Sequence, residues 1–497
     1  MNRGANILLM TAIALLSHGA ESNGVMSADY WAHWNPEVQA RIDKDIVQNR
    51  QADAKLLLKE IQPGTEVKVE QLSHAFIFGA HIFNFNQLGT TERNRKYKEL
   101  YGTLFNSATI AFYWKKFETE PGKPRFDEAE QDTEAYWNTV KEPKTQPHWR
   151  RPATDPIVAF CESKGIRLHG HTMIWGNRTW HHPDWLYEQF CPAEEKAKII
   201  ALGKEINKLQ PAEIAALAPT FAKELKRLFE KRVKELAEHY QGRLHSWDVC
   251  NESATDFSRG AMIPGDTICK SHYGLMPGDY TWQAFQTAGQ IFPKNVKLNI
   301  NDYLNNDVYA GQVKDLLARG CRIDIMGSQM HLFKPQQCLD IAEGKAIETP
   351  QQVWSRMETI SKAGLPIHLS EITITSPGSD ARGCEIQAIV ARNLYRLWFS
   401  IKPMMGITWW NVVDDCGAPG EPTISGLFTR DMEPKPSFYA LNKLINDEWK
   451  TRLNVKADDQ GRVAFRGFKG NYRLIYTDAS GASKTAVFAL LKDGDGL

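Results

Sequence analysis

Eight short runs of β-forming residues alternate with amphipathic helical stretches along most of the chain. The helical stretches, such as 221–240 and 353–364, have the apolar spacing of helices that cover one face of a sheet. Eight strand and helix units in this alternation predict an α/β fold, a closed parallel (β/α)8 TIM barrel. The expected strands are residues 75–83, 106–114, 166–175, 245–252, 296–303, 323–331, 366–374 and 405–413.

The barrel should occupy residues 71–447, with a helical insertion at about 187–220 that lengthens the third crossover. Residues 23–70 are interpreted as a short N-terminal extension, partly β, with extended segments around a Pro-Gly turn. Polar and apolar residues alternate again after residue 448, which predicts a small C-terminal β appendage over 448–497 that could pack with the N-terminal segment.

Residues 1–22, MNRGANILLMTAIALLSHGAES, have the pattern of a secretory signal peptide: one arginine, a short apolar run, then small residues. We therefore expect a secreted or periplasmic protein. No other segment is long and apolar enough to span a membrane. Export would permit disulfides, but the sequence does not determine how its eight cysteines would pair.

The charges are nearly balanced, with 60 Lys and Arg against 59 Asp and Glu and a net charge of +1. This balance provides no basic surface for nucleic acid or an anionic membrane, so a neutral substrate fits better. The absence of CxxC spacing and of Cys/His clusters argues against a zinc site, and no metal or organic cofactor is expected. Nothing in the sequence sets the oligomeric state.

Two predicted barrel strands end in glutamates, Glu252 on the fourth and Glu371 on the seventh. In a (β/α)8 barrel the chemistry lies at the C-terminal ends of the strands, so both side chains should reach one rim. Cleavage of a glycosidic bond with retention needs a carboxylic acid and a carboxylate about 5 to 5.5 Å apart. The ordinary alternative for a glutamate at a strand end is a rim carboxylate paired with Lys or Arg.

Several motifs together resemble glycoside hydrolase family 10, the retaining β-1,4-xylanases. Each motif alone is weakly specific, but they occur in barrel order over about residues 75–445. They are HGHTMIW (169–175), WDVCNE (247–252), NDY (301–303), GSQMH (327–331), LSEI (369–372), ITWWNVVD (407–414) and KPSFYAL (435–441).

The resemblance implies that Glu252 is the acid/base and Glu371 the nucleophile. It further implies that Asn251 binds a sugar hydroxyl and that His331 supports Glu371. The remaining residues that it implies for substrate binding are Lys115, His171, Trp175, Tyr303, Gln329 and Trp410. Taken singly, each of the aromatic residues is more often a core residue than a binding residue.

The sequence departs from the family pattern at five positions. Ala111 and Phe112 stand where the family has a glutamate and an asparagine that bind the second sugar on the glycone side, and Phe112 should offer an apolar surface there. Gly176 replaces a histidine, and a family tryptophan is replaced near Ala418. Thr373 replaces an aspartate behind His331, and a hydroxyl cannot supply the missing charge. Sugar preference should therefore differ while the chemistry is retained.

Three other functions remain open from the residues alone. The chain could be a hydrolase for a different β-linked glycan, or a non-catalytic carbohydrate-binding protein on a degenerated barrel. Two facing carboxylates argue against a pure binder. An aldolase-like barrel is disfavoured because no Schiff-base lysine stands at a strand end. The sequence does not decide between internal and terminal cleavage, nor does it identify the polysaccharide and its side groups.

Overall fold

The computed structural model describes residues 24–496 of the 497-residue chain, so the expected signal peptide lies outside the described residues. Eight parallel strands form a closed barrel, because β10 pairs with both β11 and β7 and β13 pairs with β3. The predicted (β/α)8 barrel is confirmed. Its strands are β3 (Ile77–His81), β4 (Ser107–Ala111), β5 (Arg167–His171), β7 (Ser246–Asn251), β10 (Lys297–Asp302), β11 (Ile325–Leu332), β12 (Ile367–Ile374) and β13 (Met404–Trp409).

A helix follows each strand and packs its apolar face against the outside of the barrel. The longest, α10, buries Leu225, Val233 and Leu236 on one face, which is the spacing of an amphipathic helix. In chain order the eight helices are α3 (Thr91–Thr103), α6 (Thr154–Ser163), α10 (Pro219–Tyr240), α12 (Tyr280–Ile291), α13 (Asp307–Ala318), α15 (Pro350–Ser361), α16 (Ala381–Ser400) and α17 (Pro436–Lys443).

The loops at the C-terminal end of the barrel carry additional elements. The segment between β4 and α6 contains α4 (Trp114–Phe117), η1 (Glu130–Asp132), α5 (Glu134–Trp137) and η2 (Pro143–Thr145). The region of the expected insertion is helical, with α7 (Asp184–Phe190), α8 (Ala193–Leu202), η3 (Gly203–Lys208) and α9 (Pro211–Ala215). Shorter elements are β6 (Ile174–Trp175), α11 (Ala254–Ser258), the hairpin of β8 (Ile268–Lys270) and β9 (Leu275–Pro277), α14 (Pro335–Ala342) and η4 (Leu444–Glu448).

The N-terminal extension is more helical than the sequence interpretation allowed. The extended segments on either side of the Pro-Gly turn are β1 (Gln51–Leu57) and β2 (Glu66–His74), whereas the residues before them form α2 (Pro36–Arg50) after the short α1 (Ala28–His33). The helix begins with the N-cap Asn35, whose Oδ1 accepts a hydrogen bond from Val38 N, and with Pro36 at its first position. It buries Ile42 and Ile46 and packs against α16 of the barrel. The helical spacing of apolar residues thus extends to Arg50, and the alternating pattern of a strand begins only at Gln51.

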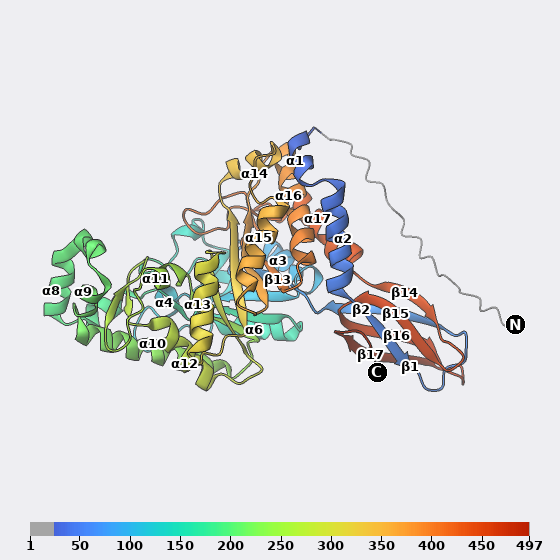
Figure 1. Ribbon diagram of the computed structural model, residues 1–497, viewed down its shortest axis with the longest axis horizontal. Coiled ribbons are helices and arrows are strands. Elements are labelled where there is room, and N and C mark those ends of the chain that lie inside the picture. Colours follow the sequence, from blue (N-terminus) through green and yellow to red (C-terminus); the bar gives the residue numbers. More distant parts are fainter. Residues whose placement is uncertain (1–23, 497) are drawn as a thin grey trace.

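The two ends of the chain build one small β domain beside the barrel. Strand β1 (Gln51–Leu57) pairs with β15 (Arg462–Phe468). Strand β2 (Glu66–His74) lies between β14 (Arg452–Lys456) and β16 (Gly470–Thr477), and β17 (Ser483–Leu490) pairs with β16. The two sheets share a separate apolar core that includes Val67, Val69 and Leu474. In Figure 1 this domain and the α8/α9 insertion lie at opposite ends of the long axis.

The described residues form no disulfide, and seven of the eight cysteines, all but Cys384, are buried. Within residues 24–496, no helix is both long and apolar enough to cross a membrane.

Candidate active site

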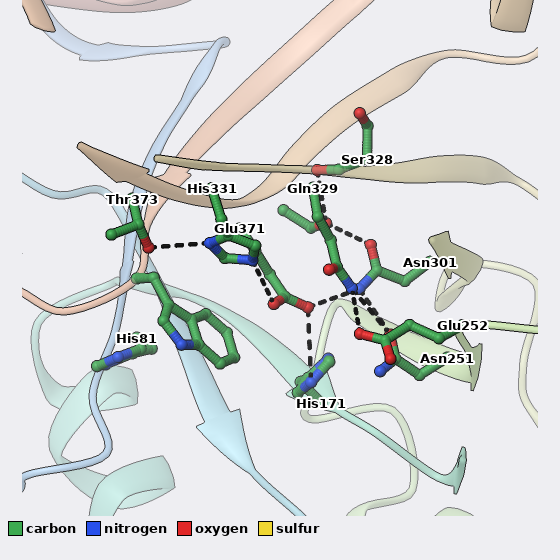
Figure 2. Close-up of polar contacts among 12 residues, drawn as sticks. His81, His171, Asn251, Glu252, Asn301, Ser328, Gln329, His331, Glu371 and Thr373 are labelled. Atoms are coloured by element: carbon green, nitrogen blue, oxygen red, sulfur yellow. Dashed lines mark hydrogen bonds and ion pairs between the residues drawn. The ribbon is translucent and has the colours of Figure 1, made fainter. Parts of the chain in front are cut away.

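The two glutamates face a common space at the C-terminal end of the barrel (Figure 2). Glu252 directly follows β7, and Glu371 lies on β12. The pairing of β12 with both neighbouring strands shifts register beside Glu371, and such irregularities change the direction of a side chain. The predicted pair of carboxyl groups is therefore carried by opposite sides of one barrel.

A chain of amide groups joins the two carboxyl groups. Asn301 Nδ2 donates to Glu371 Oε1 at 2.7 Å and to Asn251 Oδ1 at 2.8 Å. Gln329 Nε2 donates to Asn251 Oδ1 at 3.4 Å and to Glu252 Oε1 at 3.0 Å. Because Asn251 Oδ1 accepts twice, the amide NH2 of Asn251 points away from this chain (Figure 2) and remains available for a ligand hydroxyl.

Glu252 is held in an unusual backbone conformation. Its φ of 54° lies in the left-handed region, which costs a non-glycine residue of the order of 1 kcal/mol. Its backbone N–H donates to Asn301 O at 2.8 Å, which fixes this conformation. Trp175 Nε1 donates to Glu252 Oε2 at 3.1 Å. Burial raises the pKa of the Glu252 carboxyl from 4.5 to about 7, and the charge of Glu371 contributes further.

Glu371 is 5% exposed and is surrounded by groups that stabilise a negative charge. Besides the amide of Asn301, two imidazoles face it: His331 Nε2 lies 3.4 Å from Oε2, and His171 Nε2 lies 3.7 Å from Oε1. Within residues 24–496, no Lys, Arg or His nitrogen lies within 4 Å of the Glu252 carboxyl, in contrast to Glu371. The two carboxyl groups therefore have unequal environments: Glu371 lies among hydrogen-bond donors and imidazoles, whereas Glu252 has a raised pKa that suits it to carry a proton near neutral pH.

Groups behind the two imidazoles set their orientation. Asp248 Oδ2 contacts His171 Nδ1 at 2.8 Å and His169 Nε2 at 2.9 Å. Burial by itself would lower the pKa of His171, but the charges of Glu371 and Asp248 outweigh it and raise this pKa above 6.5. His331 Nδ1 lies 2.9 Å from Thr373 Oγ1. Thr373 therefore lies behind His331, in the position for which the family pattern has an aspartate.

Aromatic side chains form the walls of the site. Trp410, Phe83, Tyr113 and Ala111 make a separate apolar cluster, and Trp175 packs against it. The Trp410 ring is edge-on to His171, with ring centroids 5.6 Å apart, and its Nε1 donates to Glu421 Oε1 at 2.9 Å. Flat apolar faces next to a few fixed polar groups are the usual features of a small-molecule site.

Eight of the ten residues predicted for the site contact one another directly, and the other two lie outside this set of contacts. Lys115 forms an ion pair of 2.9 Å with Asp184. Tyr303 is 37% exposed, its hydroxyl lies 3.5 Å from Thr255 Oγ1, and it neighbours Tyr273, which lies beside Glu252. The eight that converge are His171, Trp175, Asn251, Glu252, Gln329, His331, Glu371 and Trp410.

The prediction that Phe112 offers an apolar surface to a sugar is wrong. Phe112 is completely buried and packs against Phe117, Tyr240 and Trp247. Side chains alternate along an extended segment, so Ala111 faces the site and Phe112 faces the surrounding helices.

The other departures have local structural causes. A Cβ at Gly176 would lie 2.3 Å from Ser271 Oγ, because the β8–β9 hairpin fills that space. Ala418 belongs to a loop whose backbone N–H binds Glu421 Oε2 at 2.7 Å, so a carboxylate occupies the neighbourhood of the missing tryptophan.

Four residues of the site were not singled out from the sequence. Asn301 and Asp248 lie inside the recognised motifs, Asn301 near the end of β10 and Asp248 within β7, so the motifs themselves were an available signal. Tyr113 stacks edge-on against His171, and Tyr273 lies beside Glu252 and Trp175. Both tyrosines come from loops, and no periodic pattern marks them. Within residues 24–496, no group of three or more His, Cys, Asp or Glu side chains is arranged to hold a metal ion.

Comparisons with known proteins agree with this architecture. A family model described as glycosyl hydrolase family 10 matches residues 74–444. The chain is 26% identical over 321 residues to Endo-1,4-beta-xylanase A of Caldicellulosiruptor sp. (strain Rt8B.4), covering 61% of this chain and 41% of that protein. It is 24% identical over 345 residues to Endo-1,4-beta-xylanase B of Thermotoga neapolitana, covering 67% of this chain and 84% of that protein.

A solved structure shares the fold. The crystal structure of native xylanase 10B from Thermotoga maritima has a TM-score of 0.52 at 20% identity and covers 75% of this chain and 96% of its own. The chain thus spans less than half of the Caldicellulosiruptor protein and most of the two Thermotoga proteins.

Proposed function

The chain belongs to glycosyl hydrolase family 10, and from this premise we propose that it is a secreted, retaining β-glycoside hydrolase. Its proposed substrate is β-1,4-xylan or a related plant polysaccharide. Two relatives named endo-1,4-beta-xylanase support this substrate class. The secretory pattern of residues 1–22 supports export.

The observation that carries the proposal is the unequal environment of two carboxyl groups joined by one chain of amides. Glu371 accepts from Asn301 and faces His171 and His331, which stabilises its carboxylate. Burial raises the pKa of Glu252 to about 7, so this carboxyl can hold a proton near neutral pH. A nucleophile and an acid/base are distinguished by this difference in environment.

In the first step of the proposed mechanism, Glu371 attacks the anomeric carbon while Glu252 gives its proton to the departing glycosidic oxygen. The C–O bond to the leaving sugar breaks, and an ester bond to Glu371 forms. In the second step Glu252, now ionised, takes a proton from water. The resulting hydroxide equivalent displaces Glu371 from the sugar and restores both carboxyl groups.

Neighbouring groups support the transition state in this scheme. The free NH2 of Asn251 can donate to the sugar 2-hydroxyl, a hydrogen bond that strengthens as positive charge develops on the ring. Trp175 and Gln329 hold the Glu252 carboxyl in place through Oε2 and Oε1. The faces of Trp410 and Trp175 offer platforms for the sugar rings.

The test is the stereochemistry of the product. Proton NMR recorded immediately after addition of enzyme to xylo-oligosaccharides should show the β-anomer forming first and mutarotating later. Initial formation of the α-anomer would reject double displacement. Oligosaccharide that binds without release of reducing ends would instead favour the carbohydrate-binding alternative.

A further inference from the structure

An arginine lies against the aromatic wall of the site. The guanidinium carbon of Arg151, which ends the long loop before α6, is 3.8 Å from the centroid of the Tyr113 ring and 5.4 Å from that of Phe83. Both rings belong to the apolar cluster that contains Trp410 and meets Trp175. Arg151 is half-buried, and its guanidinium lies against the side of this cluster.

The positive charge of Arg151 has no carboxylate of its own. Arg151 donates to Arg150 O at 2.6 Å and, among residues 24–496, forms no ion pair with an Asp or Glu. The carboxylate nearby is Glu421, and Arg150 Nη1 binds its Oε2 at 2.9 Å. Burial lowers the pKa of Arg151 to about 10, so the group is still charged at neutral pH.

Glu421 is already hydrogen-bonded through both of its oxygens. Its Oε2 also accepts from Ala418 N at 2.7 Å and Asn411 Nδ2 at 3.0 Å, and its Oε1 accepts from Trp410 Nε1. Of the two adjacent guanidinium groups, only that of Arg150 forms an ion pair with Glu421 within residues 24–496. The guanidinium of Arg151 therefore carries a positive charge that an anionic group of a ligand would attract.

The same wall has lost the groups that would bind neutral sugar hydroxyls. Ala111, where the family pattern has a glutamate, contributes only a methyl group to the apolar cluster. Lys115 forms an ion pair with Asp184. The charged group that lies against this wall without an ion pair within residues 24–496 is therefore the guanidinium of Arg151.

We propose that Arg151 is a specificity-determining residue that binds the carboxylate of a uronic acid on the glycone side of the cleaved bond. The substrate class is then an acidic β-glycan, such as xylan that carries glucuronic acid. This inference rests on the proposed function, and it replaces the neutral substrate suggested by the net charge of the whole chain. A guanidinium suits the role because its fork of N–H donors can bind both carboxylate oxygens.

The test is a comparison of binding in the inactive Glu371→Gln background. Isothermal titration calorimetry would use xylotetraose and xylotetraose that bears one glucuronic acid. A charge-assisted pair in a partly desolvated site should make the acidic ligand bind about 10- to 100-fold more tightly. Adding Arg151→Gln should abolish this preference. Arg151→Lys, which keeps the charge without the fork, should retain part of the preference.

Arg382→Gln is the matched control. Arg382 is an exposed arginine in the first turn of α16, which follows β12 at the same end of the barrel. Its replacement makes the same change in net charge and should leave the preference intact. Equal affinity of the wild-type residue for both ligands, or a preference that survives Arg151→Gln, would overturn the inference.

The inference and the proposed function fail in different ways. If the active enzyme cleaves xylotetraose but binds both ligands equally, the role of Arg151 is rejected and the hydrolase stands. If acidic ligand is preferred through Arg151 but neither ligand is cleaved by the active enzyme, the carbohydrate specificity stands and hydrolysis of xylan is rejected.

Discussion

Replacement of Glu371 by glutamine isolates the effect of one negative charge on the proposed acid/base. In the native protein, burial and then the charge of Glu371 raise the pKa of Glu252 from 4.5 to about 7. This rise corresponds to about 3 kcal/mol in favour of the protonated carboxyl. Glutamine keeps the shape of the side chain and removes its charge. The pKa of Glu252 should therefore fall below 7 but stay above 4.5, because burial is the larger cause.

The assay is a carbon-13 NMR titration of protein labelled at the glutamate carboxyl carbons, with the Glu252 signal identified by its loss in Glu252→Gln. The exposed Glu343 serves as control, since Glu343→Gln makes the same charge change on the surface and should leave the titration of Glu252 unmoved. A pKa of Glu252 that is the same in the native protein and in Glu371→Gln would refute the coupling. Titration of Glu252 near 4.5 in the native protein would refute the effect of burial as well.

Two further predictions concern stability. Because the pKa of Glu252 is raised on folding, the folded state holds this proton more tightly, and the resulting stability is lost as pH rises from about 4.5 through about 7. The glutamine of Glu252→Gln cannot ionise, so the variant does not lose this stability. In urea denaturation, the free energy of unfolding of the variant minus that of the native protein should therefore increase by about 2 to 3 kcal/mol from pH 5 to pH 8. A difference that does not change with pH would contradict this. Phe112→Ala should cost about 3 to 5 kcal/mol of stability and leave KM unchanged, because Phe112 is core. A raised KM without loss of stability would return Phe112 to the sugar site.

The parts of the fold that follow from periodicity could be predicted from the sequence. A buried parallel strand is a run of apolar residues, so such runs can be found in the sequence. Polar residues at the C-terminal end of such a run indicate the rim of the barrel at which catalytic residues lie. The runs that end in Asn251 and Glu252, or that contain Gln329 and His331, therefore located both the barrel and its functional rim. The β domain was partly predictable, since its alternation is visible at both ends of the chain.

Other features depend on contacts that periodicity does not encode. The ion pair that draws Lys115 away from the site requires Asp184, which lies in a different loop. The orientation of Phe112 depends on which residue is the last of β4, a boundary that propensity leaves uncertain by a few residues. Arg151 reaches the aromatic wall because a long irregular loop returns to the barrel rim. The helix over residues 36–50 had a local signal in its Asn-Pro cap, and the neighbouring strand pattern concealed it.

In the proposed mechanism, Glu371 forms a covalent bond with the sugar. This step is tested most directly by incubating the protein with a 2-deoxy-2-fluoro xylobioside that carries an activated leaving group, and then mapping the adduct by peptide mass spectrometry. The fluorine slows both steps, and the good leaving group allows the first to proceed, so the glycosyl-enzyme should accumulate. We expect one sugar adduct per protein molecule on the peptide that contains Glu371, and none in Glu371→Gln. An adduct on another residue, or turnover without any covalent intermediate, would contradict it.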